Sequence, residues 1–293
     1  IKVTLHDWLR VDSRLSHGNS ELKRNGDTCA RRGGSRHATI CGRTNRRAIR
    51  SRAIKNIERC RGPDSGGNRL AFTTDSFVVS PLFFPGGDIG SLAVHGTVND
   101  LAVSGARPRW LSLGLILEEG LPLSLLDSVV GSLGRTAAQC DVRIVTGDTK
   151  VVPRGAVDQI FINTAGIGEL HPTAPAGPQT LQPGDVLIVS GPVGSHGLAV
   201  LCARESLGFD PPPQSDSAPL WNSVSALLDA QIPVRCLRDC TRGGLAAVLH
   251  EWSAAVSLSL HIKESAVPVV PVARGVAELL GLDPLVVACE GTY

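Results

Sequence analysis

The sequence predicts a two-domain α/β protein, because strand-like and helix-like stretches alternate along most of it. Its 293 residues are 42% apolar, which is enough for a large core and favours two domains over one. Short apolar runs predict strands, and longer stretches with apolar residues every three or four positions predict helices. A segment rich in Pro and Gly, residues 171–183, separates these elements into two sets.

The first set lies between residue 68 and this boundary. Asp88 is the predicted N-cap of its first helix, and Gly105 is the predicted stop signal. Gly147 is expected to break the strand that precedes it. In chain order the elements are a strand over 69–75, a helix over 88–105, a strand over 110–117, a helix over 121–140, and strands over 142–146 and 159–165.

The second set follows the boundary and contains more helix than strand. Its elements are a strand over 186–190, a Gly-rich turn over 191–197, helices over 198–206, 219–230, 243–255 and 272–280, and a strand-like run over 286–291. The chain stops at Tyr293, directly after that run, and we expect it to be truncated. We therefore expect a first domain over 61–168 and a second domain over 169–293.

The charge is divided unevenly along the chain. Residues 1–61 hold 16 Lys and Arg against 5 Asp and Glu, whereas the remainder holds 13 against 22. A basic arm is typical of proteins that bind nucleic acid. Because no aromatic residues are interleaved with the Arg-rich run for base stacking, nucleic-acid binding is the less favoured interpretation. Residues 1–60 are predicted to be a basic segment of uncertain order, with a hint of a helix at 48–57.

Composition also restricts where the protein acts. No apolar run approaches the length of a membrane span, and no signal peptide is visible. The eight cysteines form no C-x-x-C pair, and Cys236 and Cys240 have no matching second pair of metal ligands. Reduced thiols in a cytoplasmic protein are therefore favoured over a structural zinc site.

Carboxylates at the ends of elements carry the chemical signal of the first domain. Asn99 and Asp100 interrupt the otherwise apolar helix at 88–105, and such groups are costly to bury unless they bind something. Asp75 and Asp148 lie at or near the ends of predicted strands. Magnesium prefers hard oxygen ligands and leaves coordination positions open for phosphate oxygens. The sequence therefore predicts a magnesium site formed by Asp75, Asp100 and Asp148.

Groups suited to phosphate accompany these carboxylates. Lys150 and Arg242 offer positive charge. Gly243 and Gly244 precede a predicted helix, whose first backbone N–H groups suit an anion. Neither a Walker A motif nor the kinase signature set is present. Together the carboxylates, cations and glycines favour a nucleotide–magnesium site.

Four segments carry a resemblance to a known family: residues 70–79, 94–108, 143–150 and 238–245. Val98-Asn99-Asp100-Leu101 and Gly147-Asp148-Thr149 resemble motifs of the AIR synthase-like (PurM-like) superfamily, which includes selenophosphate synthetase and thiamine-monophosphate kinase. Phe77-Val78-Val79-Ser80-Pro81 and the amino-acid sequence of residues 94–108 are similar to HypE, the carbamoyl dehydratase family of nickel–iron hydrogenase maturation. The resemblance covers about residues 68–291.

This resemblance implies the fold, the reaction and the partners. It implies two AIR synthase-like domains and a homodimer in which the first-domain sheets form a barrel. It implies ATP bound with Mg²⁺, and a substrate that is a C-terminal cysteine carbamoylated by a partner carbamoyltransferase, HypF. Dehydration of the carboxamide would give a thiocyanate, whose cyano group passes to iron on the HypC–HypD scaffold.

The resemblance also implies the site residues. The implied catalytic residues are Glu290, as base or orienting group, with Lys150 and Arg242. The implied metal ligands are Asp75, Asp100 and Asp148. The implied cofactor-binding residues are Asp75, Asn99, Asp100, Gly147, Asp148, Thr149, Lys150, Asp239, Thr241, Arg242, Gly243 and Gly244.

Several positions depart from the family pattern. Ser195 stands where the family usually has Asp, Cys240 replaces a Pro, and Cys289 replaces an Asn. Residues 17–19, His-Gly-Asn, resemble only a remnant of the N-terminal Gly-rich loop. No tail cysteine follows Cys289, which lies too far inside the fold pattern to take its place. We expect ATP binding, without dehydration of a tail of the same chain.

Other functions stay open on the sequence alone. Selenophosphate synthesis would need a reactive cysteine in an N-terminal Gly-rich loop, for which Cys29 is the only candidate. A catalytically inactive scaffold that still docks the maturation partners is a further alternative.

Overall fold

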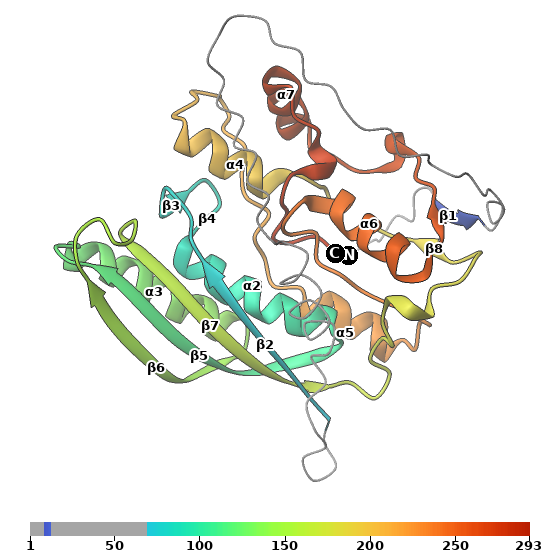
Figure 1. Cartoon of the computed structure of the whole chain (residues 1–293), viewed down its shortest axis with the longest axis horizontal. Helices are drawn as coiled ribbons and strands as arrows, with labels where there is room; N and C mark the ends of the chain where they lie inside the picture. The colour runs from blue at the N-terminus through green and yellow to red at the C-terminus, as the bar shows by residue number, and fades with distance from the viewer. Residues whose placement is uncertain (1–8, 13–68) are drawn as a thin grey trace, which may run out of the picture. The chain divides into compact units, whose positions relative to one another are not determined.

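A computed structural model describes residues 9–12 and 69–293 (Figure 1). The predicted helix at 48–57, the residues 17–19 and Cys29 fall outside the described residues. Among those that are described, no helix combines the length and the apolar character that crossing a membrane requires.

A mixed four-stranded sheet organises the first part of the described chain (Figure 1). Its strands β5 (Ala106–Glu118) and β6 (Arg143–Val152) run parallel, and both β2 (Leu70–Phe77) and β5 run antiparallel to β7 (Ile160–Leu170). Helix α3 (Leu123–Gln139) joins β5 to β6, because parallel neighbours need a crossover connection. In spatial order the strands are β2 (Leu70–Phe77), β7 (Ile160–Leu170), β5 (Ala106–Glu118) and β6 (Arg143–Val152).

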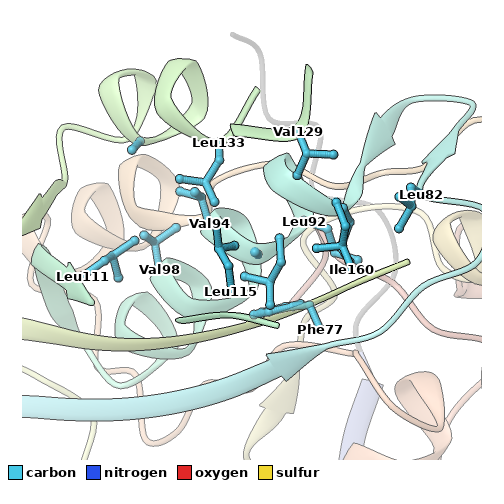
Figure 2. Close-up of a cluster of buried hydrophobic side chains, with 14 of the residues drawn as sticks. Phe77, Leu82, Leu92, Val94, Val98, Leu111, Leu115, Val129, Leu133 and Ile160 are labelled. Carbon is cyan, nitrogen blue, oxygen red and sulfur yellow. The ribbon is translucent and has the colours of Figure 1, made fainter. Parts of the chain in front are cut away.

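Helix α2 (Ile89–Val103) packs against this sheet and against α3 (Figure 1). Its N-cap is Asp88, as predicted, and the Asp88 side chain accepts from the backbone N–H groups of Gly90 and Ser91. Helix α2 is buried on nearly all sides, because the sheet, α3 and α5 (Trp221–Asp229) all contact it. Figure 2 shows the resulting core, in which residues of α2, α3 and the strands interdigitate: Phe77, Leu92, Val94, Val98, Leu111, Leu115, Val129, Leu133 and Ile160.

Strand β6 corrects one prediction. The expected break at Gly147 is wrong, because β6 runs without interruption through Gly147 to Val152. A Cβ at position 147 would lie 2.8 Å from the carbonyl oxygen of Leu113 on β5. Glycine here therefore permits the close approach of two strands rather than a turn.

The second part of the described chain has little strand. Its three-stranded sheet has the order β8 (Val186–Leu187), β1 (Leu9–Asp12), β9 (Ser259–Leu260), so one strand comes from the predicted basic segment. The strands predicted over 186–190 and 286–291 are mostly wrong: the first ends at Leu187, and the second is the short 3₁₀ helix η3 (Pro284–Val286) followed by irregular backbone.

Helices supply most of the regular structure in this second part. They are α4 (Ser195–Arg204), α5, α6 (Gly244–Val256) and α7 (Pro271–Leu280), close to the predicted ranges. Two further 3₁₀ segments, η1 (Pro178–Thr180) and η2 (Glu264–Ala266), and a short hairpin of β3 (Phe83–Phe84) and β4 (Gly87–Asp88) complete the described elements.

Candidate functional site

The centre of the candidate site lies where β2 passes α2. Thr73 and Asp75 are two apart on the strand, so they share one of its faces, whereas Asp100 follows Gly96 by one helical turn. The Thr73 hydroxyl donates to Asp100 Oδ2 at 2.8 Å. Asp75 Oδ2 lies 3.8 Å from the point that a Cβ on Gly96 would occupy. Strand alternation and helical spacing thus bring Asp75 and Asp100 to one place.

Three carboxylates from the second part of the chain, those of Asp216, Asp239 and Glu290, interact electrostatically with one another and with Asp75 and Asp100. Burial and then Asp239 raise the pKa of Asp100 to about 7. Burial, Asp239 and Asp216 raise the pKa of Glu290 well above its usual range, and burial raises that of Asp75. We call Asp75, Asp100, Asp216, Asp239 and Glu290 the acidic cluster. A bound cation would stabilise the ionised form of these partly buried carboxylates.

Two arginines bring positive charge to the acidic cluster. Arg242 lowers the pKa of Asp75, and Arg238 lowers that of Asp100, in both cases against a larger effect of burial. Arg238 is only loosely paired, with Nε 3.8 Å from Asp239 Oδ1 and Nη2 3.9 Å from Glu251 Oε2. Arg242 is exposed, so its guanidinium is open to a phosphate group. Arg242 was predicted and Arg238 was missed, although both flank the same motif.

The predicted glycine pair begins α6. Gly243 is the N-cap, with a left-handed φ of +79°, and Gly244 has a φ of +59°. A Cβ at Gly244 would lie 2.5 Å from the carbonyl oxygen of Leu285. Thr241 is half-buried and accepts from Gly244 N at 2.9 Å. These glycines therefore place the start of α6 against η3, beside Asp239 in sequence.

Asn99 is turned inward and is 2% exposed. Its Nδ2 donates to the carbonyl oxygens of Ala218 at 2.9 Å and Glu290 at 3.0 Å. Its Oδ1 accepts from the backbone N–H of Leu220 at 2.9 Å. The side chain that the sequence predicts as a nucleotide ligand thus joins α2 to two separate segments of the second part of the chain.

Asp216 is a site residue that sequence analysis missed. Its Oδ2 accepts from the backbone N–H groups of Glu290 at 3.2 Å and Gly291 at 3.0 Å. Its Oδ1 is buried, and no described residue is hydrogen-bonded to it. The only signal in the sequence is an aspartate between two serines in a Pro-rich loop, which has no periodicity to mark it.

Two buried histidines hold the loop that carries Asp216. The Nδ1 atom of His95 on α2 lies 2.9 Å from the Ser217 hydroxyl, and that of His196 on α4 lies 2.9 Å from the Ser215 hydroxyl. Burial lowers the pKa of His95 to about 4 and lowers that of His196 as well, so both rings are neutral near pH 7. Their role in the described chain is structural.

Asp148 and Lys150 do not join this centre within one chain. Asp75 is opposite Thr164, which is buried and hydrogen-bonded to Thr97 of α2, so Asp75 is on the face of the sheet that α2 covers. Asp148 belongs to the next row of the ladder, on the opposite, open face, and is three strands away, about 14 Å by strand spacing. Lys150 is two residues further along the same face. Gly147, Asp148, Thr149 and Lys150 are all exposed.

The expected metal triad is therefore not assembled by a single copy. Within residues 9–12 and 69–293, no three His, Cys, Asp or Glu side chains are arranged to hold a metal ion. The donor chemistry nevertheless fits magnesium, because Asp75 and Asp100 are partly buried hard-oxygen ligands, and Asp239 adds a third carboxylate that is 6% exposed.

The described cysteines are free thiols. Cys240 and Cys289 are buried beside the acidic cluster, and burial raises the pKa of both thiols, that of Cys240 to about 12. Gly194 N donates to Cys289 Sγ at 3.1 Å. Neither thiol is accessible enough to carry a transferable group, in agreement with the expectation for Cys289.

Comparison with known proteins defines the class first. Residues 59–170 match the family described as AIR synthase related protein, N-terminal domain, and residues 182–293 match AIR synthase related protein, C-terminal domain. The two-part α/β architecture described above is thus the AIR synthase-like fold.

More similar relatives narrow the class. The carbamoyl dehydratase HypE of Escherichia coli (strain K12) is 57% identical over 226 residues, which cover 77% of this chain and 67% of that protein. The HypE of Rhodobacter capsulatus is 50% identical over 225 residues, which cover 77% and 66%. The chain belongs to the HypE family, which confirms the resemblance, and it spans about two thirds of the length of these relatives.

Solved structures of HypE proteins also resemble this chain. Escherichia coli HypE has a TM-score of 0.74 at 56% identity and covers 77% of this chain and 70% of its own. A HypE–HypF complex has a TM-score of 0.79 at 44% identity, with coverage of 84% and 81%. A HypE in complex with ATP has a TM-score of 0.74 at 46% identity, with coverage of 86% and 78%.

Proposed function

We propose that this chain is an ATP-dependent carbamoyl dehydratase of nickel–iron hydrogenase maturation. The supporting observation is the acidic cluster beside Arg238 and Arg242, in a chain of the HypE family. One solved relative is a HypE in complex with ATP, which supports nucleotide binding by this chain. The reaction converts a carbamoylated cysteine into a thiocyanate.

Asp75 and Asp100 are the residues that would hold magnesium in this chain, and Asp239 adds negative charge beside them. When bound, magnesium neutralises charge on the phosphoryl group that is transferred. Arg242, which is exposed beside Asp75, pairs with phosphate oxygens from the other side. The helix α6, which begins at Gly244, supplies further backbone N–H groups for an anion.

The site residues act on a carboxamide in two stages. In the first, the carboxamide oxygen forms a bond to the γ-phosphorus of ATP, the bond from that phosphorus to ADP breaks, and an amide proton is lost. In the second, Glu290 takes the remaining proton from nitrogen, the carbon–oxygen bond breaks, and phosphate leaves with that oxygen. When it is ionised, the Glu290 carboxylate is a stronger base than that of an exposed glutamate, because its pKa is raised.

A homodimer completes the proposed site. The open face of the sheet carries Phe72, which is 53% exposed, and Ile116, which is 37% exposed, on the same face as Asp148 and Lys150. Exposed apolar side chains on a sheet face favour burial against a partner. Stacking two such faces would cover them and bring the Gly147–Lys150 segment of one copy toward its partner.

The partners and the compartment follow from the family. A HypE–HypF complex is known for a relative that this chain resembles closely, so HypF is the expected donor of the carbamoyl group. The HypC–HypD scaffold is the expected acceptor of the cyano group, and the cytoplasm is the expected compartment.

A dehydration assay tests the function. Cys289 is buried, so the carbamoyl group is supplied on a separate peptide that ends in cysteine. With ATP and Mg²⁺, the peptide is expected to lose one water, with one ADP and one phosphate formed per thiocyanate. Glu290→Gln should abolish this loss, whereas the matched change Glu278→Gln, at an exposed position of α7, should not. Loss of water at the same rate with Glu290→Gln would refute the assignment.

A further inference from the structure

We infer that Asn99 and Asp216 are positioning residues, which together hold the backbone of Glu290 in place. They are not ligands of the nucleotide or the metal. The inference rests on the proposed function in one respect, the assignment of Glu290 as the base. The residue types alone do not indicate this role. An amide and a carboxylate near a phosphate-binding site would be expected to bind the nucleotide or the metal.

The hydrogen bonds of Asn99 leave it little capacity for a ligand. Both N–H donors of Nδ2 are used, one by Ala218 O and one by Glu290 O, and Oδ1 accepts from Leu220 N. The side chain is 2% exposed. Because Asn99 directly precedes Asp100 on α2, it links the helix that carries the metal-binding carboxylate to the backbone of the base.

Asp216 binds the backbone N–H of Glu290, whereas Asn99 binds the carbonyl oxygen of the same residue. Its Oδ2 accepts from Glu290 N at 3.2 Å and from Gly291 N at 3.0 Å, and the Thr292 hydroxyl lies 3.4 Å away. The Glu290 residue therefore has its carbonyl oxygen bound by one side chain and its N–H bound by another. This fixes the backbone from which the Glu290 carboxylate projects.

The support for Asp216 is itself rigid. Ser215 N donates to Pro85 O at 2.8 Å, and the hydroxyls of Ser215 and Ser217 contact the two buried histidines. A Cβ on Gly291 would lie 1.9 Å from the carbonyl oxygen of Asp216, so the two segments approach too closely for any other residue. A base held through such a contact needs no adjustment when the substrate arrives.

Hydrogen exchange of the native dimer or monomer, as purified, measures the positioning directly. Asn99→Asp keeps the size and the acceptor but removes both donors. Because the new carboxylate oxygen repels the carbonyl oxygens of Ala218 and Glu290, the segments that carry them should move away from α2. Exchange at the Leu220, Glu290 and Gly291 amides should then rise by about tenfold or more. The matched control is Asn222→Asp, the same chemical change at an exposed position of α5, which should leave these amides unchanged.

Asp216 offers a conservative rescue. Asp216→Ala removes the acceptor for the Glu290 and Gly291 amides, so their exchange should rise, whereas Asp216→Asn keeps an acceptor oxygen and should restore protection to within about threefold of wild type. A ligand of magnesium would behave differently, because an amide oxygen is a much poorer ligand than a carboxylate. The two variants also keep the test decisive if Asn99→Asp fails to fold.

Nucleotide affinity separates positioning from binding. Asn99→Asp should lower the rate of peptide dehydration by about 30-fold or more while the Kd for MgATP changes by less than about threefold. Loss of MgATP binding with all three amides still protected would overturn the inference and make Asn99 a nucleotide ligand. If the wild type dehydrates no peptide, the proposed function fails, yet the exchange data still decide whether these two residues hold the Glu290 backbone.

Discussion

At the scale of single residues, Asp100 shows how a buried carboxylate lowers the stability of the folded protein. Its pKa is raised to about 7, chiefly by burial and by Asp239, so its charge is disfavoured in the folded chain. The folded state therefore holds a proton that the unfolded state loses above pH 3.8, and stability falls as the pH rises from there through about 7. A cation bound beside Asp100 would offset this cost.

We predict that Asp100→Asn stabilises the metal-free protein. The amide can still accept from the Thr73 hydroxyl but carries no charge. Its advantage over wild type should grow by on the order of 2 kcal/mol between about pH 5 and about pH 8. Urea unfolding in the presence of a chelator at both pH values measures this difference, and an advantage that shrinks with rising pH would contradict the account.

We predict the opposite dependence for His95. Its pKa is lowered from 6.5 to about 4 by burial, so the unfolded chain takes up a proton first as the pH falls. Stability is therefore lost from about pH 6.5 down to about pH 4. His95→Gln should lose about 2 kcal/mol less than wild type between about pH 7.5 and about pH 5. His250→Gln, at an exposed position of α6, is the control and should follow wild type.

At the scale of elements, the contact between α2 and α3 depends on a glycine. A Cβ at Gly90 would lie 2.4 Å from the carbonyl oxygen of Val129 on α3. Helix α3 carries its own glycine, Gly134, where a Cβ would meet nothing within 4 Å. The two positions therefore separate helix propensity from packing.

We predict that Gly90→Ala destabilises the protein by about 1–3 kcal/mol, because the helices must move apart. Gly134→Ala should instead stabilise it by about 0.5–1 kcal/mol, since alanine favours the helix and has room. Thermal or urea unfolding of both variants checks the pair. Equal effects of the same sign would show that the close approach of α2 and α3 contributes nothing.

The elements of the first part were largely predictable, because caps and periodicity are local signals. Asp88 and Gly105 marked the limits of α2, and short apolar runs marked β5 and β7. The continuity of β6 was not predictable from the sequence. A glycine that lets two strands approach closely cannot be distinguished there from a glycine that forms a turn. The strand over 286–291 failed for a related reason: an apolar run does not reveal whether neighbouring backbone is available to pair with it.

At the scale of the whole molecule, the open sheet face predicts a homodimer. We expect Phe72→Glu to shift the protein from dimer to monomer, because it would bury a charge between two sheets. Leu279→Glu, at a position of α7 that is 76% exposed, should leave the dimer intact. Sedimentation velocity measures both masses. A wild-type monomer, or a Phe72→Glu dimer as stable as the wild type, would remove the support for a shared site.

The site itself was predictable in part. Asp75 and Asp100 were predicted together, and the structure brings them together across β2 and α2. Asp148 was predicted beside them, but spacing along the chain does not reveal which face of a sheet a side chain occupies. Asp216 was missed because a loop has no periodicity, and its role depends on a residue 74 positions away. Asn99 had to bind something, but its partners are backbone groups.

Calorimetric titration with MgATP tests most directly whether the acidic cluster is the nucleotide–magnesium site. Wild type should bind, and Asp127→Asn, an exposed change on α3, should bind within about twofold of it. Asp100→Asn should bind at least about 30-fold more weakly, although its urea unfolding should show that it is folded and no less stable. Binding of MgATP to Asp100→Asn with the wild-type affinity would contradict the assignment.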